Sequence, residues 1–118
     1  MLLYDGDCRL CRLAARGVTR LDRRHALGIL PFQDPRAAPH LARVPERERF
    51  ASWHLVFPDG RRATRGDISP LLALLPATRR LAPLAQRLPL DPLYGLVSRE
   101  RGRLARFLPD GPAPRRAP

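Results

Sequence analysis

The chain is 118 residues long, with a hydrophobic fraction of 44% and a formal net charge of +11 at pH 7. A length and composition of this kind predict a single globular domain that buries its own core, which excludes a fold that needs disulfides for stability. All 22 basic residues are arginine. Because this charge comes without a nucleic-acid-binding motif or stacking aromatics, we do not expect a nucleic-acid partner.

No targeting or membrane-spanning segment is predicted. The sequence lacks a run of about 18 consecutive apolar residues, so we expect no transmembrane helix. Residues 1–5 carry neither the basic flank nor the apolar run of a signal peptide, and we therefore expect a cytoplasmic protein. In the cytosol stable structural disulfides are rare, and paired cysteines more often serve redox chemistry or metal binding.

The first residues predict a strand, a sharp turn and an amphipathic helix. Leu2-Leu3-Tyr4 is a short apolar run typical of a strand, and Gly6 allows the chain to turn into a helix over residues 8–24. On a helical wheel one side carries Leu10, Cys11, Ala14, Val18 and Leu21, and the opposite side carries an arginine ridge of Arg9, Arg12, Arg16, Arg20 and Arg23. We expect the apolar side to be buried.

Three further strands are predicted, over residues 27–32, 50–57 and 61–64. The second of these shows the alternation of apolar and polar side chains that is typical of strands. Pro58-Asp59-Gly60 is a strong turn signal, so the last two strands are expected to form a hairpin. Residues 34–49 are polar and rich in proline, which predicts a loop with a short helix near residues 36–43.

After Gly66 the pattern becomes helical. Ser69-Pro70 is typical of an N-cap followed by proline, and later prolines divide the region into short helices. Its leucines are predicted to face the core rather than a membrane surface: Leu71, Leu74, Leu75, Leu81, Leu84, Leu88, Leu93 and Leu96. We assign residues 1–108 to the domain and residues 109–118, which lack apolar periodicity, to a disordered tail.

The strongest chemical signal is the pair Cys8 and Cys11. Two cysteines three positions apart lie about one helical turn from each other, so a disulfide can close with little backbone movement. The positive end of the helix dipole favours a thiolate at this position. Cys8 lies on the flank of the first turn, and Cys11 falls among the buried side chains. We therefore predict that Cys8 is the nucleophile and Cys11 the resolving thiol.

Charged residues surround this pair. Arg9 and Arg12 favour a thiolate, whereas Asp5 and Asp7 oppose it. Asp7 can also cap the helix, and Asp5 can either shape the turn or carry the proton of the resolving thiol. We assign Asp5 to catalysis, and Asp7, Arg9 and Arg12 to substrate binding.

Two other functions remain open from the residues alone. A small zinc-binding protein would need four ligands, but the chain offers one Cys-x-x-Cys and no His-x(3–5)-His pair among His25, His40 and His54. We assign no metal site and give these histidines no role. A non-catalytic module could instead use the arginine ridge to bind nucleic acid or another anion.

The segment Tyr4–Cys11 resembles the opening of the DCC family of predicted thiol–disulfide oxidoreductases, whose Asp-x-x-Cys-x-x-Cys pattern is matched by Asp5, Cys8 and Cys11. Weaker likenesses follow in the family's order across residues 2–107: Pro31–Pro35, Asp59-Gly60, Arg65-Gly66-Asp67 and Tyr94–Arg101.

The resemblance implies an α/β, thioredoxin-like fold. We expect a small mixed four-stranded sheet flanked by helices, with a helical C-terminal extension. It also implies thiol–disulfide exchange with protein or small-molecule substrates and without a cofactor. Thioredoxin-like proteins usually place a cis-proline just before the third strand, whereas Ala51 and Ser52 stand there in this chain.

Overall fold

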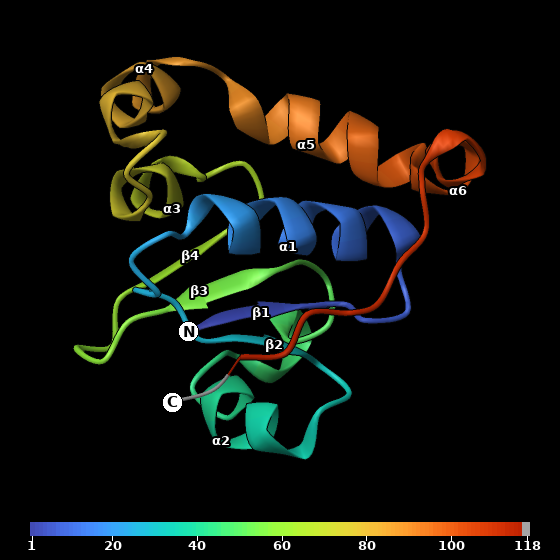
Figure 1. Cartoon of the computed structure of the whole chain (residues 1–118), viewed down its shortest axis with the longest axis horizontal. Coiled ribbons are helices and arrows are strands. Elements are labelled where there is room, and N and C mark those ends of the chain that lie inside the picture. The colour runs from blue at the N-terminus through green and yellow to red at the C-terminus, as the bar shows by residue number, and fades with distance from the viewer. Residues whose placement is uncertain (117–118) are drawn as a thin grey trace.

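A computed structural model describes residues 1–116, and its centre is a mixed four-stranded sheet (Figure 1). The strands are β1 (Leu2–Tyr4), β2 (Ile29–Pro31), β3 (His54–Val56) and β4 (Arg62–Thr64), in the order β2-β1-β3-β4. β1 pairs parallel with β2 and antiparallel with β3, and β3 pairs antiparallel with β4. With helices flanking the sheet, this arrangement confirms the predicted thioredoxin-like α/β fold.

The strands β1, β2 and β3 are buried on both faces, which explains their mostly apolar sequences, whereas β4 at the edge buries only Ala63. Successive side chains of a strand point to opposite faces, so Leu2 and Tyr4 lie on one side of the sheet and Leu3 on the other. The first side packs under helix α1 (Arg9–Leu21), and the second packs over α2 (Ala38–Leu41). The parallel pair β1–β2 requires a crossover, and α1 provides it.

Helix α1 is rotated relative to the predicted wheel. Ala15 is its one fully buried residue, and Cys11 and Val18 pack with it against the sheet. Ala14 and Leu21, predicted to be buried, are exposed. Cys11, Ala15 and Val18 follow the i, i+4, i+7 spacing and face the sheet. Ala14 and Leu21 therefore lie at the edge of the contact between the helix and the sheet.

The C-terminal extension consists of short helices, as predicted. They are α3 (Ser69–Leu74), η3 (Arg79–Leu81), α4 (Ala82–Arg87), α5 (Leu90–Arg99), α6 (Arg101–Leu104) and η4 (Ala105–Phe107), with η1 (Pro35–Ala37) and η2 (Glu46–Glu48) earlier in the chain. Proline lies in the first turn of α3 and α4. None of the helices described is both long and apolar enough to cross a membrane.

Most leucines of this extension do not reach the core. Leu75 is buried, and Leu71 and Leu74 pack against the core, as expected. Five others are between 49% and 54% exposed, which corrects the prediction for Leu81, Leu84, Leu88, Leu93 and Leu96. The reason is their position, because α5 runs across α1 rather than across the sheet and α4 lies at the end of the molecule (Figure 1).

Two local predictions also need correction. Ile68, not Ser69, is the N-cap of α3, and the Ser69 hydroxyl donates a hydrogen bond to Asp67 at 3.3 Å. The third strand is shorter than expected because residues 50–53 leave the sheet. The indole of Trp53 instead donates to the carbonyl oxygen of Arg65 at 3.0 Å.

Residues 109–116, here called the C-terminal segment, run back along α1 to the edge of the sheet (Figure 1). This differs from the predicted disordered tail, of which Ala117 and Pro118 lie outside the described residues. The Tyr4 hydroxyl donates to the carbonyl oxygen of Pro114 at 2.6 Å. Arg116 forms an antiparallel bridge with Ile29 and an ion pair with the buried Asp22.

Candidate active site

The loop between β1 and α1 is held by a close backbone approach. The Gly6 amide donates to the Gln33 side-chain oxygen at 2.9 Å. A Cβ at Gly6 would lie 2.7 Å from that oxygen and 2.8 Å from Cβ of Pro31. Only glycine fits here without displacing its neighbours, and the loop therefore delivers Cys8 to the start of α1 in a fixed position.

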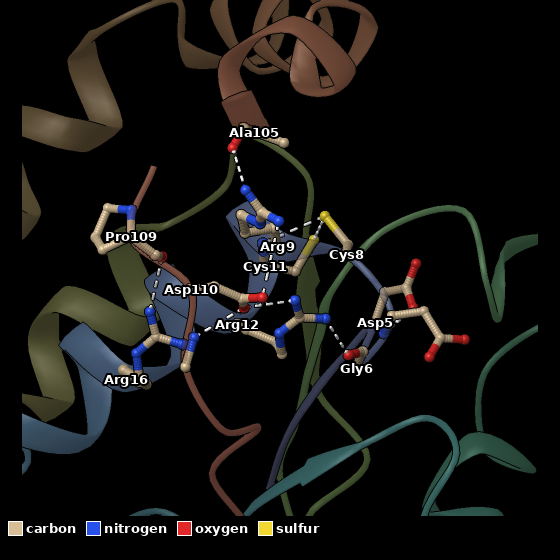
Figure 2. A network of polar contacts seen from close by, with 12 residues as sticks. Asp5, Gly6, Cys8, Arg9, Cys11, Arg12, Arg16, Ala105, Pro109 and Asp110 are labelled. Carbon is tan, nitrogen blue, oxygen red and sulfur yellow. Dashed lines mark hydrogen bonds and ion pairs between the residues drawn. The ribbon is translucent and has the colours of Figure 1, made fainter. Parts of the chain in front are cut away.

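Cys8 itself is the N-cap of α1. Its sulfur accepts a hydrogen bond from the Cys11 amide at 3.3 Å, and the Cys11 thiol donates to the same sulfur at 2.6 Å (Figure 2). Both cysteines are free thiols. The structure thus brings the two predicted redox residues into contact, and Cys8, not Asp7, occupies the capping position that the sequence also offered to Asp7.

The two cysteines open onto different hollows. Cys11 lines an apolar pocket of about 310 Å³ between α1, α3, α5 and the end of the sheet. Cys8 lines a second, open hollow of about 500 Å³ between the start of α1 and α6. Asp5, Leu10 and Arg101 border both. A visiting molecule in the second hollow would therefore meet Cys8 first.

The surroundings of Cys11 also change its acidity. Burial raises the pKa of the Cys11 thiol to about 12, and the hydrogen bond to Cys8 and the negative charges of Cys8 and Asp5 act in the same direction. Arg101 acts weakly in the opposite direction. At neutral pH Cys11 is therefore a protonated donor to the sulfur of Cys8.

The two carboxylates of the loop lie on the same side of Cys8. One amide group, Nε2 of Gln33, donates to Asp5 at 3.1 Å and to Asp7 at 3.2 Å. Asp5 also accepts the backbone amide of Asp7 at 3.0 Å, so it shapes the turn. It is half-buried and borders the pocket of Cys11, whereas Asp7 is exposed and borders only the hollow of Cys8.

The predicted substrate-binding arginines already have partners in the chain (Figure 2). Arg12 donates to the Gly6 carbonyl oxygen at 2.8 Å and to Asp110 at 2.7 Å. Arg9 donates to the Ala105 carbonyl oxygen at 2.9 Å and lies 3.8 Å from Asp110. The arginine ridge is therefore partly covered by the C-terminal segment.

The structure adds residues that sequence reasoning missed. Asp110 contacts α1 from the segment predicted to be disordered. Arg106, together with Arg101, borders the hollow of Cys8 from the opposite wall. Gln33 holds the loop, and its place in the Pro31–Pro35 motif was a signal that could have identified it.

The residues before the third strand also border the Cys11 pocket. Ala51, Ser52 and Trp53 line it, and the hydroxyls of Ser52 and Tyr94 lie 2.7 Å apart. All peptide bonds in the part of the chain described are trans. Across residues 1–116, no group of three or more His, Cys, Asp or Glu side chains is arranged to hold a metal ion.

Comparison with known proteins agrees with this geometry. The model of the DCC1-like thiol-disulfide oxidoreductase family matches residues 2–107, which include the whole sheet, the cysteine pair and the C-terminal helices. No curated protein and no solved structure gives a significant match. On the strength of this nearly complete match, the chain belongs to the DCC1-like thiol-disulfide oxidoreductase family.

Proposed function

We propose that the chain catalyses thiol–disulfide exchange through Cys8 and Cys11, with Cys8 as the attacking residue and Cys11 as the resolving residue. The observation that carries this proposal is the 2.6 Å contact between the two sulfurs at the start of α1. Both thiols are free and neither is enclosed by metal-binding side chains among the described residues. A disulfide between them needs only a small local movement.

The reaction begins when Cys8, as a thiolate, attacks one sulfur of a substrate disulfide. The substrate S–S bond breaks, and the other sulfur leaves with the bonding electrons and takes up a proton. Cys11 then loses its proton, and its thiolate attacks Sγ of Cys8. This releases the second substrate sulfur, which is also protonated, so the substrate gains two electrons and two protons while the protein pair forms a disulfide. An external dithiol reverses these steps and restores the pair.

The different surroundings of the two cysteines support this division of roles. Cys8 borders the open hollow, where a substrate sulfur can reach it, and its sulfur lies against the Cys11 amide and the Cys11 sulfur. Cys11 has a strongly raised pKa and borders the apolar pocket, so it remains a thiol until Cys8 is blocked by substrate. Asp5, whose charge acts on Cys11, is the proposed acceptor of the Cys11 proton.

Two serine variants test the roles. We expect Cys8→Ser to abolish the reduction of a small disulfide, because the attacking sulfur is gone. We expect Cys11→Ser to accumulate a stable mixed disulfide, because the resolving sulfur is gone. Mass spectrometry of acid-quenched samples would detect the trapped adduct and locate it on Cys8.

The pre-reduced parent protein, freed of reductant, serves as the control. After mixing with a disulfide it should lose two free thiols and carry an intramolecular disulfide. Equal and full activity in both variants would show that the assigned roles are wrong. A parent protein that never loses its thiols in a disulfide-containing buffer would refute the function itself.

A further inference from the structure

The hollow in front of Cys8 has two walls of different chemistry. One wall is the loop and first turn of α1, with Asp5, Asp7, Arg9 and Arg12, and the other comes from α6 and η4, with Arg101 and Arg106. Its volume of about 500 Å³ lies within the range of about 300–1,000 Å³ that is usual for small-molecule sites. The hollow is therefore large enough for a small thiol or disulfide beside the Cys8 sulfur.

The arginines of the two walls differ in their partners. Arg9 and Arg12 are held by Asp110 and by backbone carbonyl oxygens. Within residues 1–116, Arg101 and Arg106 form neither an ion pair nor a side-chain hydrogen bond. Two guanidinium groups without partners on one wall of a hollow are suited to an anion, since each can bind a carboxylate through paired N–H donors.

The acidic residues of the hollow lie on the wall opposite Arg101 and Arg106, so they do not neutralise the positive charge of these two arginines. Asp5 and Asp7 lie on the loop wall, where Gln33 donates to both carboxylates. A bound anion would therefore lie toward the wall of α6 and η4. The negative charges of Cys8 and Asp5 raise the pKa of Cys11, and the positive charge of Arg101 lowers it. The charge of Arg101 therefore acts at the cysteine pair.

We propose that this hollow selects low-molecular-weight thiols and disulfides that carry a carboxylate group, and that Arg101 and Arg106 bind this carboxylate while the substrate sulfur faces Cys8. The proposal rests on the exchange function proposed above and names its substrate class. Arg101 and Arg106 attract the anionic substrate and orient it, and Cys8 performs the chemistry.

A pair of alkylating reagents tests the charge at Cys8 without requiring disulfide exchange. Iodoacetate and iodoacetamide both transfer a two-carbon group to a thiolate and release iodide, but only iodoacetate is anionic. In a Cys11→Ser background, the ratio of the iodoacetate rate to the iodoacetamide rate reports the local potential at Cys8. We expect this ratio to exceed that of a free thiol, and to fall about tenfold at low ionic strength in Arg101→Gln/Arg106→Gln.

The matched control is Arg99→Gln/Arg103→Gln, which removes the same total charge from α5 and α6. Both arginines are exposed and neither borders the hollow, and Arg103 pairs with Glu100. We expect the control to change the ratio by less than about twofold, because screening weakens distant charges. Urea unfolding curves that match the parent would show that both double variants are folded.

Disulfides then connect the charge to the function. Dithiodiglycolate is anionic, the disulfide of mercaptoethanol is neutral and cystamine is cationic. For each compound, we divide the rate measured with the double variant Arg101→Gln/Arg106→Gln by the rate measured with the parent protein. This ratio cancels the differences in intrinsic reactivity between the compounds. We expect this ratio to be about 0.1 for dithiodiglycolate, close to one for the neutral disulfide and above one for cystamine.

The outcomes separate the two proposals. Reaction with every disulfide and no dependence on charge would overturn the substrate class but leave the exchange function standing. An equal loss of rate with all three compounds, or the same loss in the control variant, would also overturn it. No reaction with any disulfide, despite a normal iodoacetate ratio, would instead refute the exchange function, and with it the assignment of a substrate.

Discussion

Arg12 and Asp110, which are 98 positions apart in the chain, form a hydrogen-bonded ion pair of 2.7 Å that fastens the C-terminal segment to α1 (Figure 2). The same guanidinium donates to the carbonyl oxygen of Gly6 at 2.8 Å, so the contact links the segment to the active-site loop. The hydrogen bond from Arg12 lowers the pKa of the Asp110 carboxyl, and the Gly111 amide acts in the same direction. A change at Asp110 is therefore expected to affect both the segment and the loop.

The first prediction concerns Asp110→Asn. Removal of the charge should loosen residues 109–116 and speed their backbone hydrogen exchange at neutral pH, as measured by mass spectrometry. Because the folded-state pKa of Asp110 is lowered, its contribution is present above the ordinary carboxyl pKa and is lost as the pH falls through the lowered value. Asp59→Asn is the matched control, since Asp59 pairs with Arg61 in the hairpin. Exchange in the segment that is the same for both variants would argue against the fastening role.

The second prediction concerns Tyr4, which is buried beneath the C-terminal segment. Tyr4→Phe removes the donor to Pro114 and should lower the free energy of unfolding by about 0.5–1.5 kcal/mol, measured by urea denaturation. Burial raises the pKa of Tyr4 from 10.0 to about 12. The unfolded state therefore loses this proton first, so stability should fall as the pH rises from about 10 toward 12.

Tyr4→Phe should remove this alkaline component of the stability curve. Cys11 contributes a decline of the same sign from about pH 9, because its folded-state pKa is also raised, and Tyr4→Phe retains this decline. Comparison of the parent and Tyr4→Phe in a Cys11→Ser background therefore isolates Tyr4. Parallel curves for the two proteins above pH 10 would contradict the assignment.

The third prediction pairs two glycines of opposite character. Gly6→Ala should lower the free energy of unfolding by about 1–3 kcal/mol, because the new Cβ would overlap the Gln33 side chain and the Pro31 ring. Gly17→Ala should raise it by about 0.5–1 kcal/mol, because Gly17 lies within α1 and a Cβ there meets no atom within 4 Å. Thermal or urea unfolding of both variants gives the signs, and a stabilising Gly6→Ala would rule out the close approach.

The fourth prediction tests the role of Asp5. If its carboxylate accepts the Cys11 proton, Asp5→Asn should slow the decay of the mixed disulfide about 100-fold while leaving its formation nearly unchanged. If Asp5 only raises the pKa of Cys11, the same variant should speed the decay, because the thiolate of Cys11 becomes easier to form. Rapid-quench mass spectrometry distinguishes the two, and Asp7→Asn is the control because Asp7 does not border the Cys11 pocket.

The strands and the cysteine pair could be predicted because their signals are local. Leu2-Leu3-Tyr4, the turn at Asp59-Gly60 and the spacing of Cys8 and Cys11 each depend on a few adjacent residues. Propensity favours Asp over Cys at an N-cap, which is why the sequence offers Asp7 as a possible cap of α1. In the structure Cys8 is the cap, and the carboxylate of Asp7, one residue earlier, accepts a hydrogen bond from Gln33 instead.

The remainder of the site depends on contacts between distant residues, which leave no local pattern. Nothing in the sequence around Asp110 indicates that it faces α1, and nothing around Arg106 indicates that it borders Cys8. Helical periodicity likewise predicts that Leu84 and Leu96 belong to amphipathic helices, but it does not say whether the layer beneath is the sheet or α1. Tertiary placement decides these cases.

The bridge between Arg116 and Ile29 has a consequence for aggregation. β2 is an edge strand, and such strands can recruit a second chain through their unpaired amides. The backbone groups of Gly28 and Phe32 form hydrogen bonds with β1. Because these groups alternate in direction along a strand, the backbone groups of Ile29 and Pro31 point away from β1, and proline has no amide to donate. The amide of Ile29 is thus the outward donor of this strand, and Arg116 occupies it. The last described residues of the chain therefore leave the β2 edge without a free outward amide that a second chain could pair with.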